Sequence, residues 1–385
     1  MKITVPTIDF GTSKIVTMVA QSNGERCDIV GSGAVPYSGY LQDGWNNPDE
    51  IRDVIRTAID QAQKTGNCRI HELNVGVPGM FTRVIVKEVH VSLTGPDPHV
   101  TAQDVRACFK LAEESGGDRI IHSAPAWFRV DDGKKTLSPV GIKGRELSAM
   151  IALVTADKYF IDDITYRLRD MDIEPREFYS TVAGEATYAL SQDERDKTAM
   201  LIDIGYLCTD VMVMEGDALI FHKCLDIGGG HISADIAEQL NIPFPFVEEK
   251  IKQTYSFNST NQDETYVIPA TEDEPARTVR RDEVTPIIEA KVEEIAEAIN
   301  KALEEGGVKL GKWSNVYLTG GGLILNKGGK DFLAGKLHRI IREAQRTNNK
   351  MTSHVFSSAV GLTILVVTTQ EEQKAPEGGA KGLFS

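Results

Sequence analysis

The sequence predicts an α/β fold with two duplicated halves and a smaller β-rich domain inserted into the first half. Three observations support this prediction. The same Asp-x-Gly pattern follows an expected strand twice, at Asp9 and at Asp203. Glycine turns follow expected strands at Gly11, at Gly228–Gly230 and at Gly320–Gly322. Between the two Asp patterns lies a series of β-branched segments with one helical pattern, which indicates an insertion.

Length and composition indicate a globular protein of several domains. The chain has 385 residues, and domains usually span roughly 100–200 residues. Hydrophobic residues make up 41% and charged residues 25%, which provides enough apolar material for a buried core. The formal net charge is −14, and no basic block occurs that could neutralise nucleic-acid phosphates. We therefore exclude a nucleic-acid-binding function.

The cysteines and the apolar runs indicate the compartment. Five cysteines without a CxxC pair argue against a disulfide framework and against a zinc site. We expect Cys208 to be a small packing residue rather than a reactive thiol. No apolar run reaches the roughly 18–20 residues that cross a bilayer, and the start of the chain shows no targeting pattern. These features fit a cytoplasmic protein.

The chain is expected to divide into five parts. These are a first half of residues 1–71 and 157–195, an inserted domain of residues 72–156, a second half of residues 196–235 and 306–369, a subdomain of residues 236–305, and a disordered tail of residues 370–385.

Each part has its own pattern of elements. The first half should contain two strands around a turn in residues 3–20, a strand over 27–33, a helix from Asn47-Pro48 to Gly66 and a helix around 161–171. The insertion should contain strands in residues 73–93, 120–130 and 148–155, and a helix with Thr101 as N-cap and Asp104 three residues later. The remainder should contain strands over 199–203, 211–214, 218–224 and 315–319, a loop or small hairpin over 258–283, a helix from Thr285-Pro286 to Gly306, and an apolar segment over 357–367.

The glycine turns and their neighbours are candidates for binding phosphate groups. Glycine lets the backbone approach a phosphate closely, and consecutive backbone N–H groups form a cradle for an anion. Thr12, Ser13 and Lys14 add hydroxyl and ammonium donors beside the first turn. Asp9 and Asp203 are hard oxygen groups suited to Mg²⁺, held through its water ligands. One glycine turn alone is explained as a tight turn, whereas three turns with a repeated Asp-x-Gly pattern are more specific.

These motifs resemble those of the FtsA family of bacterial cell-division proteins, which belongs to the actin/Hsp70/sugar-kinase superfamily. The similarity runs in order over residues 1–368. It comprises a first phosphate motif at 8–15, a second at 201–210, a Gly-Gly segment at Gly228-Gly229 with His231, a helix at 249–252, a third nucleotide motif at 317–322 and a terminal helix at 359–362.

The resemblance implies an actin-like duplicated ATPase fold, with ATP and Mg²⁺ bound in a cleft between the halves. It implies that residues 72–156 are the FtsA-type inserted domain, which makes filament contacts, and that residues 236–305 line the adenosine. The implied cofactor-binding residues are Asp9, Gly11, Thr12, Ser13, Lys14, Asp203, Gly205, Thr209, Gly228, Gly229, Glu249, Lys252, Gly320, Gly321 and Gly322, with Asp9 and Asp203 also organising the metal.

The resemblance also implies a function and partners. The family polymerises into filaments and tethers the tubulin-like protein FtsZ to the membrane. We therefore expect an ATP-binding cytoskeletal scaffold in cell division or in membrane-associated assembly, cytoplasmic or peripheral at the inner face of the cell membrane. The expected partners are copies of the chain itself and FtsZ or another division or assembly protein.

The second phosphate motif departs from the family pattern. The family reads Asp-x-Gly-Gly-Gly-Thr-Thr-Asp, whereas two glycines are replaced here by Tyr206 and Leu207. A positive φ at such bulky residues would be strained, by on the order of a kcal/mol or more. We therefore expect either a different loop path or a looser hold on the γ-phosphate.

Two further departures concern hydrolysis and the membrane. The family carries an acidic residue near Thr181, but the nearest carboxylates here are Glu177 and Glu185. We assign no catalytic residue and expect at most a slow ATPase. The tail lacks the family's basic amphipathic helix, so we expect membrane contact to be weak or to come from a partner.

Two alternatives within the same superfamily stay open. A small-molecule kinase would need a catalytic Asp aimed at a substrate hydroxyl, and the FtsA-like insertion argues against it. An assembly adaptor like the pilus protein PilM would bind a membrane-protein tail, and the missing amphipathic helix favours it. The Gly228-Gly229-x-His231 segment favours FtsA instead.

Overall fold

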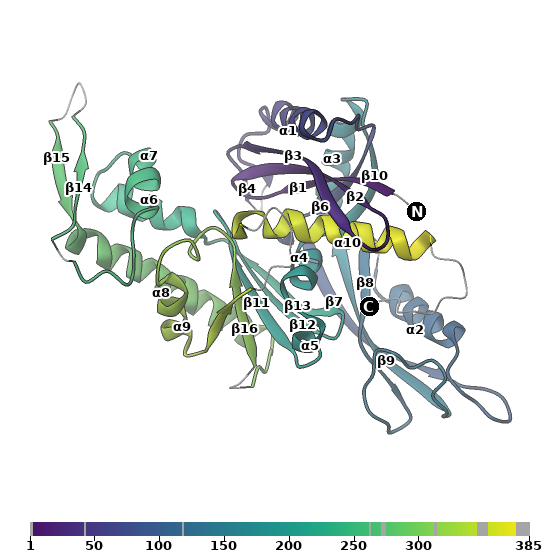
Figure 1. Ribbon diagram of the computed structural model, residues 1–385. Coiled ribbons are helices and arrows are strands. Elements are labelled where there is room, and N and C mark those ends of the chain that lie inside the picture. Colours follow the sequence, from purple (N-terminus) through teal and green to yellow (C-terminus); the bar gives the residue numbers. More distant parts are fainter. Residues whose placement is uncertain are drawn as a thin grey trace. The chain divides into compact units, whose positions relative to one another are not determined.

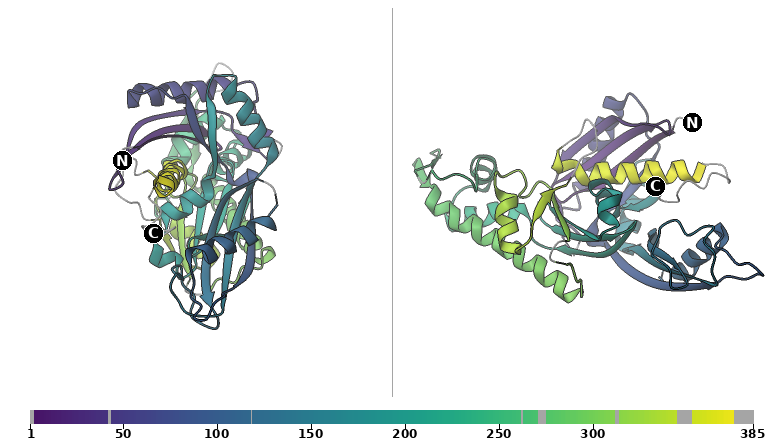
Figure 2. Two further views of the ribbon diagram at one scale, coloured as in Figure 1. Left: turned by 90° about the vertical axis from the view of Figure 1, so that its right-hand side faces the viewer. Right: turned by 60° about the horizontal axis from the view of Figure 1, so that its bottom comes forward.

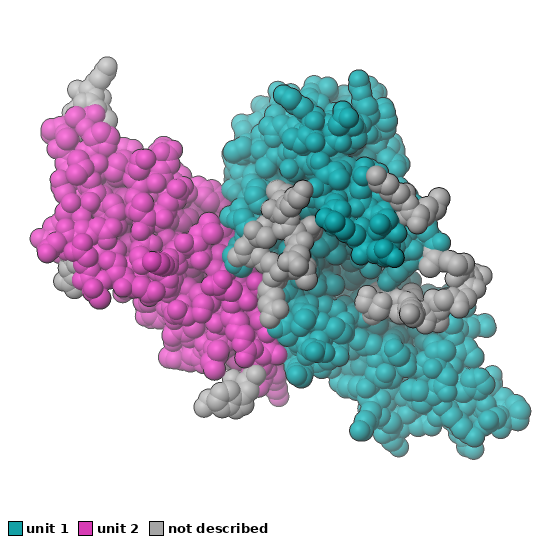
Figure 3. Space-filling model, in the orientation of Figure 1, with its two compact units in different colours: residues 1–200, 212–223, 345–385 teal, residues 201–211, 224–344 magenta. Residues whose placement is uncertain are grey.

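The computed structural model describes residues 3–41, 44–117, 119–261, 263–270, 275–311, 314–344 and 353–374. It divides into two compact units, coloured separately in Figure 3. Residues 1–200, 212–223 and 345–385 form the first unit, and residues 201–211 and 224–344 form the second.

The first unit is built on a five-stranded sheet with the order β10-β6-β1-β2-β3 (Figure 1). Its strands are β1 (Ile3–Phe10), β2 (Lys14–Ser22), β3 (Cys27–Pro36), β6 (Glu72–Val77) and β10 (Glu174–Ser180). The first three strands form an antiparallel meander, and β6 and β10 join beside β1 in parallel.

Helices cover both faces of this sheet. They are α1 (Ile51–Gly66), α3 (Lys158–Arg169), α4 (Thr181–Ala189) and α10 (Ser357–Lys374). Side chains of β1 alternate between the two faces: Phe10 packs with the α1 and α3 side, and Val5 packs against Leu362 of α10. Helix α10, yellow in Figures 1 and 2, runs along the face opposite α1. This alternation is the period of two expected for a strand that is buried on both sides.

A three-stranded sheet with one helix forms the inserted domain. The order is β7-β9-β8, with β7 (Thr82–Ser92), β8 (Ile120–Val130), β9 (Glu146–Ala156) and the helix α2 (Ala102–Glu114). The predicted cap is confirmed, because the Thr101 hydroxyl accepts from the Asp104 N–H while the Asp104 carboxylate accepts from the Thr101 N–H. Strand β6, predicted within the insertion, belongs to the five-stranded sheet instead, so the three-stranded sheet begins at Thr82 rather than at residue 72.

A second five-stranded sheet repeats the order of the first. It reads β13-β12-β11-β16-β17, with β11 (Ala199–Ile204), β12 (Thr209–Glu215), β13 (Ala218–Leu225), β16 (Asn315–Thr319) and β17 (Ile341–Glu343). Read from its meander edge, the first sheet is β3-β2-β1-β6-β10, so the strands correspond one to one. This correspondence confirms the predicted duplication.

The second unit also contains helices and a small hairpin. They are α6 (Gly229–Gln239), α7 (Phe244–Phe246), the π-helix η2 (Val247–Lys252), α8 (Arg281–Glu305), α9 (Gly329–Leu337) and the hairpin of β14 (Thr265–Ile268) and β15 (Arg277–Arg280). Short elements elsewhere in the chain are β4 (Tyr40–Leu41), β5 (Gly44–Trp45), η1 (Gly79–Phe81), α5 (Gln192–Arg195) and η3 (His354–Phe356).

Two predicted helix starts are wrong. Helix α1 starts at Ile51, three residues after Pro48. Helix α8 starts at Arg281, so Pro286 lies inside it. The Arg280 N–H donates to the Glu283 carboxylate at 2.9 Å, and this contact marks the start that the Thr285-Pro286 pair obscured.

The predicted disordered tail begins too early. Helix α10 continues to Lys374, so residues 370–374 are helical. Gln370 is buried, and its amide donates to Asn74 Oδ1 at 3.3 Å, so a polar contact extends the helix beyond its apolar run. The rest of the predicted tail lies outside the described residues. In the part of the chain that the structure describes, no helix is long and apolar enough to cross a membrane.

Helices α4 and α10 approach so closely that only glycine fits between them. A Cβ on Gly361 would lie 2.5 Å from Glu185 Cα, and a Cβ on Gly184 would lie 2.9 Å from the Gly361 carbonyl oxygen. Both are backbone contacts, which cannot move aside as a flexible side chain would.

We expect Gly361→Ala to lower the free energy of unfolding by about 1–3 kcal/mol, because the new methyl group forces the two helices apart. Urea unfolding followed by circular dichroism measures the change. Gly335→Ala in α9 is the matched control, since a Cβ there meets nothing within 4 Å. A Gly361→Ala protein as stable as the control variant would contradict this packing.

Candidate nucleotide-binding site

The first phosphate turn is a tight hairpin between β1 and β2. The Gly11 N–H donates to the Lys14 carbonyl at 3.1 Å and closes the turn around Thr12 and Ser13. The Tyr37 hydroxyl donates to the Gly11 carbonyl at 2.8 Å and fixes the turn from outside. The structure thus brings the predicted residues of this motif together in one loop.

Asp9 is a buried carboxylate at the end of β1. Its side chain is 5% exposed, and the Ser358 hydroxyl, in the first turn of α10, lies 3.1 Å from each of its two oxygens. Burial raises the pKa of Asp9 to about 6, while the Ser358 hydrogen bond and the Lys14 charge act in the opposite direction. A buried carboxylate with so little compensating charge is a group that a cation would stabilise.

The second phosphate turn closes like the first. The Gly205 N–H donates to the Cys208 carbonyl at 2.9 Å, so Tyr206 and Leu207 occupy the two positions that Thr12 and Ser13 occupy in the first hairpin. The expected strain is absent, because neither Tyr206 nor Leu207 has a positive φ. The loop keeps the same closure because it depends on backbone groups alone.

The Tyr206 side chain lies over the start of α6. A Cβ on Gly230 would come within 3.1 Å of its ring, and the ring centroid lies 5.8 Å from Lys252 Nζ. The Tyr206 carbonyl accepts from the Gly230 N–H at 2.7 Å. The Tyr206 ring therefore packs between the start of α6 and Lys252 of the π-helix.

Three glycine segments meet around Asp203. Gly320 has φ +88°, and a Cβ there would lie 2.0 Å from Asp203 Oδ1. The Gly322 N–H donates to the Ile204 carbonyl at 2.7 Å, and the Gly229 N–H donates to the Gly205 carbonyl at 2.9 Å. The predicted glycine segments at 228–230 and 320–322 therefore lie together beside Asp203.

Contacts between these segments leave no room for side chains. A Cβ on Gly229 would lie 2.4 Å from Gly322 Cα, and a Cβ on Gly322 would lie 2.4 Å from the Gly205 carbonyl oxygen. Gly321 lies between two of the packed glycines. The result is a main-chain surface without side chains next to the Asp203 carboxylate, where a ligand could approach the backbone closely.

Two polar side chains hold the Gly228 turn in place. His231 Nδ1 accepts from the Gly228 N–H at 3.1 Å, which caps the start of α6. The Thr209 hydroxyl is buried and donates to the Ile227 carbonyl at 2.7 Å. Thr209, predicted to contact the cofactor, thus holds the strand that leads into the glycine turn.

The π-helix η2 determines which charged residues are buried near Tyr206. Its wider turn brings Val247, Ile251 and Lys252 into buried positions. Lys252 Nζ lies 3.5 Å from the Glu248 carboxylate, and burial lowers the pKa of Lys252. Glu249, which was predicted to bind the cofactor with Lys252, is exposed, and the acidic partner of Lys252 is Glu248.

Sequence reasoning missed three residues of this region: Ser358, Glu248 and Asn326. The Asn326 amide donates to the carbonyls of Lys252 at 2.6 Å and Tyr255 at 3.0 Å and so fixes the end of the π-helix. Ser358 is 349 residues from Asp9 in sequence. A single sequence contains no signal for such distant pairs.

Comparison with known proteins identifies the family. A family model for cell division protein FtsA matches residues 200–361, and a model for the SHS2 domain inserted in FtsA matches residues 79–155. The two matches together cover more than half of the chain. The chain belongs to the FtsA family. The match to the SHS2 domain agrees with the β-rich insertion expected over residues 72–156.

Curated FtsA proteins resemble the chain over most of its length. Cell division protein FtsA of Pseudomonas aeruginosa is 24% identical over 376 residues, which are 95% of this chain and 89% of that protein. Cell division protein FtsA of Bacillus subtilis is 26% identical over 306 residues, which are 78% of this chain and 70% of that protein.

Solved structures identify the fold as actin-like. A PilM-PilN type IV pilus biogenesis complex contains a chain with a TM-score of 0.63 at 17% identity, covering 95% of this chain and 99% of that chain. The crystal structure of MreB 5 of Spiroplasma citri bound to AMPPNP has a TM-score of 0.56 at 11% identity, covering 96% and 98%. This FtsA-family chain thus has the duplicated actin-like fold with an FtsA-type insertion.

The buried Asp9 predicts a pH-dependent stability. The ordinary pKa of an Asp is 3.8, so the raised value near 6 means that protonation favours the folded state. Above pH 6 the buried charge costs the fold about 3 kcal/mol, and this penalty disappears as the pH falls towards 4. We expect Asp9→Asn to be more stable than the parent at pH 8 in EDTA, and the difference to vanish near pH 4.

Urea unfolding across this pH range measures the difference. The exposed Asp49 provides the control, since Asp49→Asn should match the parent protein at every pH. An Asp9→Asn variant that is no more stable than the parent at pH 8 would show that the carboxylate is not destabilised by its burial.

Proposed function

We propose that this FtsA-family chain is an ATP-binding, actin-like cytoskeletal protein of cell division that polymerises into filaments. The observation that carries the proposal is the pair of matching Asp-x-Gly hairpins, together with glycine segments packed around Asp203. The curated relatives support the cell-division role, because they are named cell division protein FtsA. The MreB 5 structures, bound to AMPPNP and to ADP, support nucleotide binding by this fold.

The residues fit the chemistry of a magnesium nucleotide. Asp9 and Asp203 would hold Mg²⁺ through its waters, and the ion would neutralise charge on the phosphates. The Gly11–Lys14 turn offers backbone and side-chain donors to the β-phosphate side. The glycines at 228–229 and 320–322 offer backbone surface to the adenosine and the remaining phosphates. Lys252, paired with Glu248, would flank the base or the ribose.

Hydrolysis in this protein should be slow. Near the position where the family carries an acidic residue, the Thr181 hydroxyl is buried and donates to the Val77 carbonyl at 2.9 Å. It is therefore engaged in the fold and does not act as a base. The nucleotide would serve as a structural switch of the filament rather than as a substrate of rapid turnover.

The scaffold role requires partners. We propose that copies of the chain assemble with one another and that FtsZ, or another division or assembly protein, binds the resulting filament. Membrane contact would come from such a partner. The PilM likeness, at 17% identity, concerns the fold alone, whereas the match of the inserted domain to the FtsA type favours the FtsA role over a PilM-like adaptor or a kinase.

Electron microscopy of the purified protein tests the proposal. We expect filaments with ATP and Mg²⁺ and few or none without nucleotide, and filaments on lipid only when a membrane-bound partner is added. Asp203→Asn should reduce the affinity for a fluorescent ATP analogue at least tenfold and abolish filaments while the protein stays folded by circular dichroism, because the metal-organising charge is lost.

The control is Asp193→Asn, an isosteric change at an exposed position. It should bind nucleotide and polymerise as the parent does. A parent protein that neither binds ATP nor forms filaments would refute the proposal, and turnover of tens of ATP per second would refute slow hydrolysis.

A further inference from the structure

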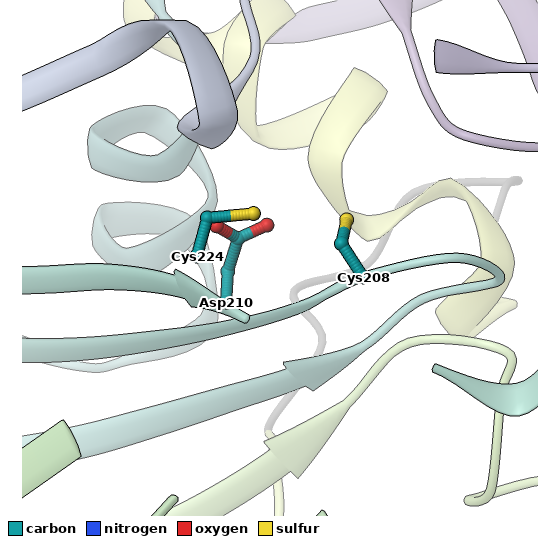
Figure 4. Close-up of side chains that lie close together, drawn as sticks. All are labelled: Cys208, Asp210 and Cys224. Atoms are coloured by element: carbon teal, nitrogen blue, oxygen red, sulfur yellow. The ribbon is translucent and has the colours of Figure 1, made fainter. Parts of the chain in front are cut away.

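Two cysteines and an aspartate meet beside the second phosphate turn. The Sγ atoms of Cys208 and Cys224 and a carboxylate oxygen of Asp210 all lie within 4.8 Å of one another. Figure 4 shows the three side chains directed towards a common space. Within the described part of the chain, no other group of three or more such side chains comes as close.

The sheet explains why these residues meet. Cys208 immediately precedes β12 and Asp210 lies within it, so residues two positions apart point to the same side of the strand. Cys224 lies on β13, which neighbours β12 in the sheet. The closed turn from Gly205 to Cys208 fixes the position of the first thiol.

The Asp210 carboxylate places a negative charge beside the two thiols. Cys208 is buried, and Asp210 and Cys224 are half-buried. The Asp210 carboxylate, which lies beside both sulfur atoms, would favour a cation placed among the three side chains.

The donor set selects a particular kind of cation. Thiolates are soft ligands that prefer Zn²⁺ and related ions, whereas Mg²⁺ requires oxygen ligands. Two Cys and one Asp are three ligands of the kinds that Zn²⁺ accepts. Three protein ligands leave one position of a tetrahedral ion for water.

We propose that Cys208, Asp210 and Cys224 form a binding site for Zn²⁺, with water as the fourth ligand. Binding converts both thiols to thiolates and releases their two protons to the solvent, so charge and atoms balance without an oxidant. The ion ties the second phosphate turn to β13. Its two thiolate ligands are soft, whereas the carboxylates proposed for Mg²⁺, Asp9 and Asp203, are hard.

The site is invisible to motif searches because its cysteines are sixteen residues apart. The absence of a CxxC motif argues only against a zinc site whose two cysteines lie in the same loop. Here the second thiol is supplied by the neighbouring strand. Cys208, expected to be a packing residue, is buried, but its sulfur lies next to a second sulfur and a carboxylate.

Metal titration of the reduced, EDTA-treated and desalted 385-residue chain tests the proposal. Co²⁺ serves as the spectroscopic probe, because thiolate ligands produce a charge-transfer absorption in the near ultraviolet, and Zn²⁺ then displaces it. We expect one ion per chain and a rise in the melting temperature with Zn²⁺, since the ion binds the folded state. Nucleotide is left out, so the result does not depend on ATP binding.

Three variants and a control assign the ligands. Cys208→Ser and Cys224→Ser should each weaken Zn²⁺ binding by more than about tenfold. Replacing a residue that only hydrogen-bonds to a metal ligand already costs about tenfold or more in affinity, and loss of a ligand itself should cost at least as much. Asp210→Asn keeps both thiols and should weaken binding while leaving the charge-transfer band. Cys68→Ser, at a half-buried cysteine outside the cluster, should bind as the parent does.

Several outcomes would overturn the proposal. They are a parent protein without a charge-transfer band, an affinity unchanged in all three variants, and an equal loss in Cys68→Ser. Formation of a Cys208–Cys224 disulfide in air, with no zinc bound by the reduced protein, would also overturn it and would identify the pair as a redox couple.

Discussion

The packing of glycine backbones around Asp203 is the constraint on which the second half of the site depends. Three segments, from the β11 turn, the start of α6 and the end of β16, touch through atoms of the main chain. A side chain at any of these contacts would collide with backbone. Because the fold holds the three segments together, the main-chain surface and the Asp203 carboxylate are positioned before any ligand arrives, which lowers the entropic cost of binding.

The two hairpins show how such a site tolerates sequence change. Gly11 and Gly205 close their turns with the same backbone hydrogen bond to the residue three positions later. Side chains in the middle of the turn are not needed for this bond. Tyr206 and Leu207 can therefore replace smaller residues without a positive φ, and the tyrosine ring packs near Lys252. The side chains in the turn can therefore change while the backbone hydrogen bond that closes it stays the same.

The sequence predicts those features that depend on residues close together in the chain. The duplication was visible because a strand end, an Asp and a Gly recur with the same spacing, and the cap at Thr101 was visible because both partners lie within one turn. The start of α8 was missed because Pro286, which usually marks a first turn, is tolerated in the second. Glu248 was missed although its four-residue spacing from Lys252 is a local signal. Ser358 and Cys224 were missed because strands and helices far apart in sequence bring them to their partners.

Helix α10 acts as a strut that connects the Asp9 carboxylate to the polar contacts of Asn74 and Ser22. Its first turn supplies Ser358, and about 18–20 Å further along the helix Gln370 bonds to Asn74 and Glu371 bonds to Ser22. Helix α10 thus contacts β1, β2 and β6 at once. Truncating the protein after Thr369 would remove the outer anchors of this strut while leaving its contact with Asp9. Fusions and tags at this end therefore belong beyond Lys374, where they leave the strut intact.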